Sequence, residues 1–236
     1  MRTRSVLALL ASLALTLPAS GAAQQVAFAA TAVSDLDSAT QAAVLRELGR
    51  ARTRGLPVQP LVAKVREGQI KRAAPERIRR AVAALAARLD SARAALGTGS
   101  NAEELVAGAD ALSAGVDQGA LRAVRAASGT RDLAAPLGAL AQLVASGVPV
   151  RRATAMILEL VQRNAGPDEV LAFGVAVEAD VGAGVPAEES ALFRLRAMEA
   201  QGLVGERLTV TAPGDPLTGV PSSSGGGGSS KPKRRP

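Results

Sequence analysis

Apolar residues recur along most of the chain at the three- and four-residue steps of an amphipathic helix. The clearest stripe would follow one face of a single long helix. Its apolar members are Ile78, Val82, Leu85, Leu89, Ala92 and Leu96. Shorter stripes with the same step begin at Leu105, Leu133 and Val170. Each predicted helix therefore buries one face only, and neighbouring helices have to stack.

Glycine and proline separate these stripes at regular places. Gly55-Leu56-Pro57-Val58 recurs as Gly147-Val148-Pro149-Val150 and again as Gly184-Val185-Pro186-Ala187, while Pro75 and Pro167 follow the first two motifs at the same distance. Glycine is favoured just after a helix, and proline is tolerated in the first turn of the next. Each motif therefore predicts the end of one helix and the start of another.

The fold class that follows is all-α. Successive helix starts lie roughly 16 to 23 residues apart, which is the spacing of short helices joined by tight turns. We expect eight or nine helices in repeated α-hairpins, the first over about Asp35–Arg52 and the last over about Glu188–Gly202. Such an array is either a short solenoid or an irregular bundle. Alanine, the best helix former, supplies much of the apolar content, and only 1% of residues are aromatic.

Composition divides the chain into five segments. Residues 1–23 are expected to be a signal peptide, 24–33 a lead-in segment and 34–205 the helical-repeat domain. Residues 206–212 have strand character and could pair with Val26 to Ala29 near the start. Residues 213–236 are rich in Gly, Ser and Pro and carry basic residues, so we expect a disordered tail.

The first residues have the pattern of an export signal. A basic start is followed by an apolar run from Val6 to Leu17 that ends at Pro18. This run is too short for a bilayer span of roughly 20 residues. Small residues then predict cleavage near Ala22 or Ala23. We expect a periplasmic or secreted protein with no transmembrane segment in the mature chain.

The chain contains no Cys and no His. It therefore lacks a thiol nucleophile, the commonest general base and the usual zinc ligands. Lys64 and Lys71 lie among arginines, without the Ser-x-x-Lys spacing of a nucleophile and base. Gly97 to Ser100 lacks the pattern of a phosphate-binding loop. We expect no enzyme activity, no catalytic residues, no cofactor and no metal.

Charge is unevenly distributed along the sequence. Residues 46–93 hold 13 basic and 4 acidic side chains, whereas residues 94–212 hold 9 basic and 14 acidic ones. A basic helix face can bind an anion or an acidic partner, although it can equally be an ordinary solvated face. The tail could be an electrostatic tether or only a solubilising segment. The candidate anion- or partner-binding residues are Arg66, Lys71, Arg72, Arg77, Arg79, Arg80, Lys231, Lys233, Arg234 and Arg235.

Three acidic pairs are candidates for catalytic carboxylates: Glu103-Glu104, Asp168-Glu169 and Glu188-Glu189. Each pair falls just after a predicted helix start. Acidic residues in a first turn stabilise the helix dipole by about 0.3–1 kcal/mol each, which accounts for their position without a catalytic role. We therefore favour a structural interpretation.

Two functions remain open from the sequence. The first is an exported, non-enzymatic helical-repeat protein that acts as a protein-interaction or scaffold module, with a protein partner or self-association. The second is a protein that binds an anionic polymer or the envelope surface, through the basic segment 46–93 and the basic C-terminal tail. Nucleic acid is disfavoured because the basic segment has no aromatic residue on which bases could stack.

Overall fold

The computed structural model describes residues 33–200 and 202. The chain divides into two units, Met1–Gly205 and Glu206–Pro236, and the second lies wholly outside the described residues. Within the described part every regular element is a helix and no strand occurs, which confirms the all-α class. The expected signal peptide, the short extended segment 206–212 and the C-terminal tail lie outside the described residues.

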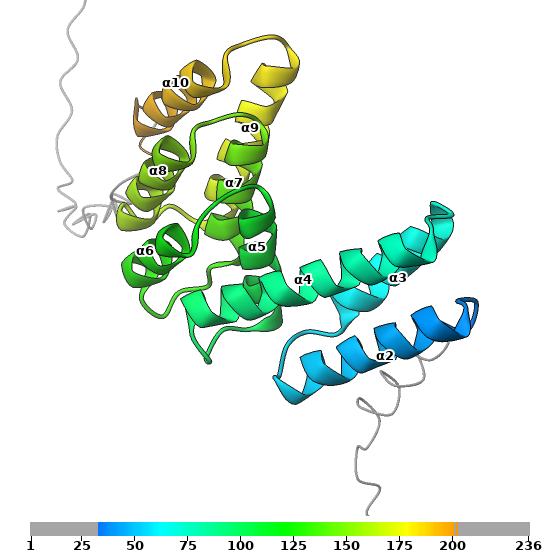
Figure 1. Ribbon diagram of the computed structural model, residues 1–236. Helices are drawn as coiled ribbons and strands as arrows, with labels where there is room; N and C mark the ends of the chain where they lie inside the picture. The colour runs from blue at the N-terminus through cyan, green and yellow to red at the C-terminus, as the bar shows by residue number, and fades with distance from the viewer. Residues whose placement is uncertain (1–32, 201, 203–236) are drawn as a thin grey trace, which may run out of the picture. The chain divides into compact units, whose positions relative to one another are not determined.

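Nine labelled helices follow one another along the described chain (Figure 1). They are α2 (Ser38–Thr53), α3 (Gln59–Ile70), α4 (Pro75–Leu96), α5 (Ala102–Ser113), α6 (Gln118–Ser128), α7 (Ala134–Ala145), α8 (Val150–Gln162), α9 (Pro167–Gly182) and α10 (Ala187–Ala200). The predicted ends of the first and last helices were a few residues off. Asp37 begins α2 by accepting a hydrogen bond from the Thr40 N–H, so the helix starts after Asp35.

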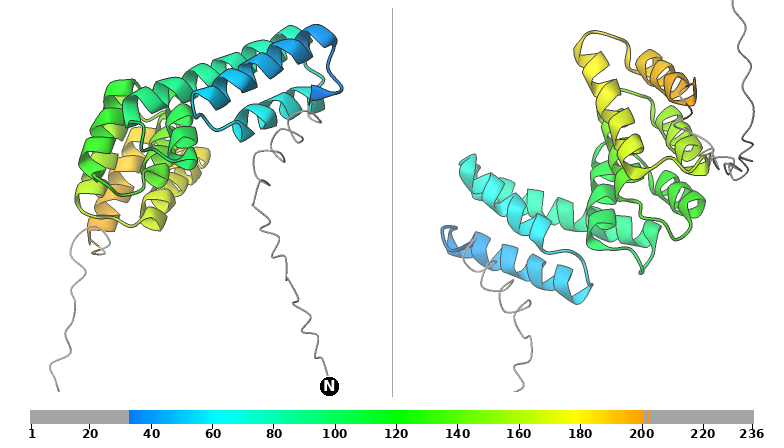
Figure 2. Two further views of the ribbon diagram at one scale, coloured as in Figure 1. Left: turned by 90° about the horizontal axis from the view of Figure 1, so that it is seen from below. Right: turned by 180° about the vertical axis from the view of Figure 1, so that it is seen from behind.

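The long helix α4 joins two groups of helices (Figures 1 and 2). Both α2 and α3 pack against α4 and form a small three-helix group with it. The C-terminal half of α4 packs against α5, where Gly108 lies close to Ala92 and Leu96. A helix of 22 residues is long enough to serve both groups.

From α4 onward, the most extensive contacts join helices that are not consecutive in the chain. One row consists of α5, α7 and α9, and a second row consists of α4, α6 and α8. The last helix, α10, packs against α9. Helices α5 to α9 begin at residues 102, 118, 134, 150 and 167, so their starts are 16 or 17 residues apart. This regular stacking is the packing of a short solenoid.

One type of turn ends six of the helices. In each, a residue with positive φ is followed by a residue whose N–H bonds to a carbonyl five residues earlier, which is the Schellman motif. The positive-φ residues are Gly55, Arg72, Gly115, Gly147, Asn164 and Gly184. The predicted helix ends at Gly55, Gly147 and Gly184 are thus confirmed. The prolines of these motifs were expected in the first turn of the next helix, but Pro57, Pro149 and Pro186 lie just before α3, α8 and α10. Arg72 stands where glycine or asparagine is usual.

A single hydrophobic cluster runs through the described helices. It is built from Leu, Val and Ala, and Phe173 is the one buried aromatic residue among those described. None of the helices in this part of the chain is long and apolar enough to cross a membrane.

Candidate functional site

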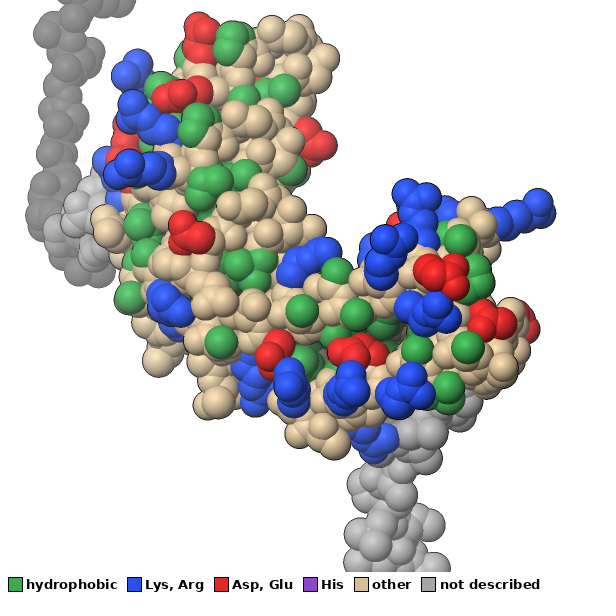
Figure 3. Space-filling view, in the orientation of Figure 1, with side chains coloured by type: hydrophobic (Ala, Val, Ile, Leu, Met, Phe, Trp, Pro, Cys, Tyr) green, Lys and Arg blue, Asp and Glu red, His purple; other side chains and the backbone are tan. Residues whose placement is uncertain are grey.

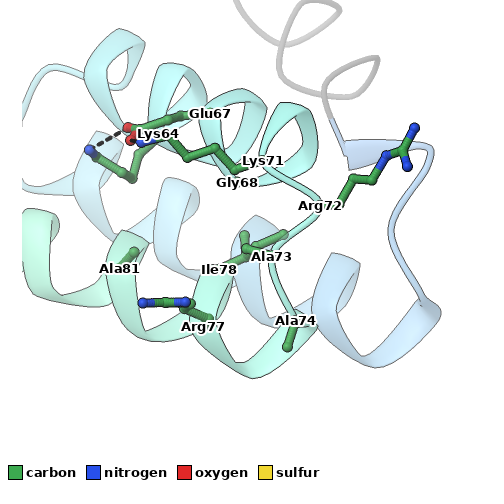
Figure 4. Close-up of a pocket in the computed structure, with 10 residues that line it drawn as sticks. All are labelled: Lys64, Glu67, Gly68, Lys71, Arg72, Ala73, Ala74, Arg77, Ile78 and Ala81. Atoms are coloured by element: carbon green, nitrogen blue, oxygen red, sulfur yellow. Dashed lines mark hydrogen bonds and ion pairs between the residues drawn. The ribbon is translucent and has the colours of Figure 1, made fainter.

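A groove of about 410 Å³ lies between the end of α3 and the first half of α4. Its walls are the ten residues labelled in Figure 4, and we name it the α3–α4 groove. Gly68 lets the two helices approach closely, because a Cβ at this position would lie 2.7 Å from Ile78 Cγ1. Pro75 then opens α4 as its first residue. Between the helices the chain turns through Ala73 and Ala74, whose small side chains leave the groove open.

Glu67 is held between two lysines inside the groove. Its carboxylate oxygens lie 2.5 Å from Lys64 Nζ and 2.6 Å from Lys71 Nζ. These hydrogen bonds, together with the charges of the two lysines, lower the pKa of Glu67 to about 2. Glu67 is therefore ionised at neutral pH and neutralises one of the nearby cations.

The groove keeps an excess of positive charge after this neutralisation. Its lining has four cations, Lys64, Lys71, Arg72 and Arg77, against the single carboxylate of Glu67, which leaves a net charge of three. The side chains of Arg72 and Arg77 are exposed and form no hydrogen bond or ion pair with any described residue. Figure 3 shows basic side chains gathered over α2, α3 and α4. This arrangement can attract anionic groups, whereas it offers no nucleophile paired with a base.

Arg72 has an unusual backbone conformation for its residue type. Its φ is 48°, in the left-handed region that costs a residue with a Cβ roughly 1–2 kcal/mol. Its side chain extends away from the Lys64–Glu67 pair in Figure 4. The neighbouring Ile70 is 82% exposed. The turn thus exposes the apolar side chain of Ile70 and the basic side chains of Lys71 and Arg72, at the conformational cost of the positive φ.

The other predicted residues on α3 and α4 are spread around the groove. Arg66 and Arg80 are exposed but do not line it. Arg79 is directed toward α2, where it donates a hydrogen bond to Thr40 Oγ1 at 2.9 Å, and it also pairs with Glu76 at 2.9 Å. Arg79 therefore connects α4 to α2 and does not line the groove. Lys231, Lys233, Arg234 and Arg235 lie outside the described residues.

The acidic pairs do lie in the first turns of α5, α9 and α10. The expectation that dipole stabilisation alone accounts for them was incomplete, because Glu104 is buried. One of its carboxylate oxygens accepts hydrogen bonds from the Asn101 N–H and from Arg125, and the other accepts one from the Leu133 N–H. Glu104 thus connects the start of α5 to α6 and α7.

Other acidic residues also have structural partners. Glu169 accepts a hydrogen bond from the Gly166 N–H at 2.7 Å and so caps α9. Glu188 pairs with Arg152 of α8 at 3.1 Å. Among the described residues there is no group of three or more acidic side chains placed to hold a metal ion.

Sequence reasoning missed two features of the groove. The first is the pairing of Glu67 with two lysines. The spacing of three and four residues in Lys64, Glu67 and Lys71 places them on one helix face, and this spacing could have predicted the pairing. The unusual turn was also readable, since Arg72-Ala73-Ala74-Pro75 aligns with Asn164-Ala165-Gly166-Pro167 and puts arginine at the positive-φ position.

Comparison of the chain with protein-family models, with curated proteins and with solved structures finds no match.

Proposed function

We propose that this chain is an exported, non-enzymatic helical-repeat protein that binds an anionic polymer through the α3–α4 groove. The observation that carries the proposal is Arg72, an exposed arginine kept in a left-handed turn beside a groove with excess positive charge. Strained backbone positions are often found at functional sites. The strained conformation of Arg72 therefore supports a binding role for this residue.

The groove chemistry supports a polyanion with repeated charges. Arg72 and Arg77 make no internal ion pair among the described residues, and Lys64 and Lys71 share only one carboxylate. Guanidinium groups bind carboxylate, sulfate and phosphate oxygens through paired donors. The groove and the turn contribute no aromatic side chain, so they do not favour stacked bases. A sulfated, phosphorylated or uronic-acid polymer fits this surface best.

The test compares the mature full-length chain with its Arg72→Gly variant on a sulfated glycan such as heparin. Removing this cation should raise the dissociation constant about fivefold, since one basic side chain near an anionic surface contributes about 1 kcal/mol. The same change should raise thermal stability, because glycine adopts positive φ without strain. A variant that is more stable but binds more weakly is expected if Arg72 serves binding at the expense of stability.

Two control variants separate this effect from general changes. Asn164→Gly alters the equivalent turn after α8 and should leave binding unchanged. Arg151→Glu reverses an exposed charge at the start of α8, far along the chain from the groove, and should weaken binding far less than Arg77→Glu. Equal losses for Arg151→Glu and Arg77→Glu would contradict the groove as the site. If only an acidic protein bound, and no polymer did, the protein-interaction function would replace the one proposed.

The proposal includes export with removal of residues 1–22 or 1–23. The basic start, the short apolar run and the small residues before Gln24 support it. N-terminal sequencing of the protein from the native envelope or medium should begin at Ala23 or Gln24. A chain that still begins at Met1 would exclude cleavage.

A further inference from the structure

The last described helix, α10, has one stripe of side chains turned away from the array. The stripe consists of Glu189, Phe193, Arg196 and Ala200, at helical steps of four, three and four. All four side chains are exposed, and Phe193 keeps 65% of its surface accessible. Figure 3 shows basic, acidic and apolar side chains close together over α10. We name these four residues the α10 stripe.

In two earlier helices the residues that correspond to Phe193 are buried. Counted from the start of each helix, the equivalent residue is Val124 in α6 and Met156 in α8, and both are buried. The turns that precede these helices show the same difference. Val116 and Val148 are buried, whereas Val185 before α10 is 38% exposed. Phe193 and Val185 are therefore exposed at positions whose equivalents in and before α6 and α8 are buried.

The two charged residues of the stripe are available for a partner. The side chains of Glu189 and Arg196 form no hydrogen bond or ion pair with a described residue. Their neighbours behave differently, since Arg194 pairs with Asp180 at 2.6 Å and Glu188 pairs with Arg152. The stripe thus combines one exposed aromatic ring with one unpaired charge of each sign.

We propose that the α10 stripe binds the α10 stripe of a second copy of this chain, with the two helices antiparallel about a two-fold axis. Glu189 and Arg196 lie on either side of a midpoint between Leu192 and Phe193. They are separated by seven residues, or about 10 Å along the helix. In an antiparallel pair, each Glu189 lies opposite the partner's Arg196, and the two Phe193 rings meet near the axis.

Self-complementarity favours a second copy over a different protein. An isologous interface requires a surface on which every residue finds its counterpart in the same surface. The α10 stripe meets this condition, because reversing its direction exchanges an acid for a base and leaves the ring in the middle. Burying the two rings removes apolar surface from water, and this supplies most of the driving force.

The test is the oligomeric state of the mature full-length chain, measured by sedimentation equilibrium over a range of concentrations. Glu189→Arg and Arg196→Glu should each place like charges opposite one another twice per dimer and raise the dissociation constant at least tenfold. The double variant Glu189→Arg with Arg196→Glu should restore association, because it only exchanges the two partners. Phe193→Ala should also weaken the dimer, and Arg151→Glu is the control.

Two results would overturn this proposal. One is a chain that stays monomeric up to about 1 mM, the concentration at which even weak specific pairs form. The other is a dimer whose dissociation constant is unchanged by Phe193→Ala and whose association is not restored by the double charge exchange. That result would indicate contacts elsewhere, such as the basic α2–α4 surface against acidic residues. Circular dichroism of each variant should show unchanged helicity, since all the substituted residues are exposed.

Discussion

Glu104 is the side chain that joins more elements than any other ionic residue described above. It caps α5 through Asn101, pairs with Arg125 of α6 at 2.9 Å and accepts the Leu133 N–H at the start of α7. Only 6% of its side chain is exposed. A buried carboxylate is tolerated because three donors replace the water it loses.

Replacing Glu104 should therefore be much more damaging than replacing its neighbour. Glu104→Ala leaves two backbone N–H groups without their acceptor and leaves Arg125 with only Ser100 Oγ, at 3.2 Å. We expect a loss of about 3 kcal/mol in the free energy of unfolding. Glu103→Ala removes an exposed first-turn acid and should cost less than about 1 kcal/mol. Urea denaturation of both variants measures the difference, and equal losses would contradict the assigned network.

Residue-level roles were only partly predictable from the sequence. Acidic residues at helix starts were recognised, because the first-turn preference is local. The burial of Glu104 was not, since it depends on where α6 and α7 lie. The same limit applies to Arg79, which resembles its neighbours in sequence but contacts Thr40 on α2.

At the scale of elements, the close approach of α3 to α4 depends on Gly68. A Cβ there would meet Ile78, which is buried and branched at Cβ, so the neighbour cannot move aside at low cost. Gly49 in α2 has nothing within 4 Å of the corresponding position. Gly68 and Gly49 both lie inside helices, but only Gly49 has room for a Cβ atom, so the two positions can be compared directly.

Gly68→Ala should destabilise the protein although alanine is the better helix former. Overpacking costs about 1–3 kcal/mol, which exceeds the gain in helix propensity of about 1 kcal/mol. Gly49→Ala should instead stabilise by about 0.5–1 kcal/mol. Thermal unfolding of both variants tests the contrast, and a stabilising Gly68→Ala would show that α3 and α4 can separate without loss.

The positions of the helices along the chain were largely predictable, whereas which helices pack against one another was not. Stripes such as Ile78 to Leu96 and signals such as Gly147-Val148-Pro149 are local, and they placed most helices within a few residues. Periodicity identifies the buried face of a helix but not what covers it. The stacking of α5 on α7 and α7 on α9, rather than of consecutive helices, therefore became clear only from the structure.

At the scale of the whole molecule, two carboxylates make the fold sensitive to acid. Hydrogen bonds from Arg194 and Ser190 lower the pKa of Asp180 from its ordinary 3.8 to about 2. The clamp of two lysines lowers that of Glu67 to about 2 as well. In both cases the unfolded chain takes up the proton at a higher pH than the folded chain does.

Stability should therefore fall as the pH drops from about 4.5 to about 2. Above this window both groups are ionised and contribute fully, and below it their contributions are lost. Asp180→Asn should lower the melting temperature at neutral pH. Plotted against pH, the melting temperature of this variant should meet that of the unmodified protein near pH 2. Parallel curves over the whole range would show that the Asp180–Arg194 pair does not stabilise the fold.

The recurrence of helix starts every 16 or 17 residues from α5 to α9 has a consequence for how such a chain can change in length. The α3–α4 groove uses only residues 64–81, before this periodic part begins. Duplication or loss of a two-helix unit in the gene would lengthen or shorten the distance between the groove and the terminal helix. It would leave the residues of the α3–α4 groove and of the α10 stripe as they are, so the spacing between these two proposed binding surfaces can change without altering either of them.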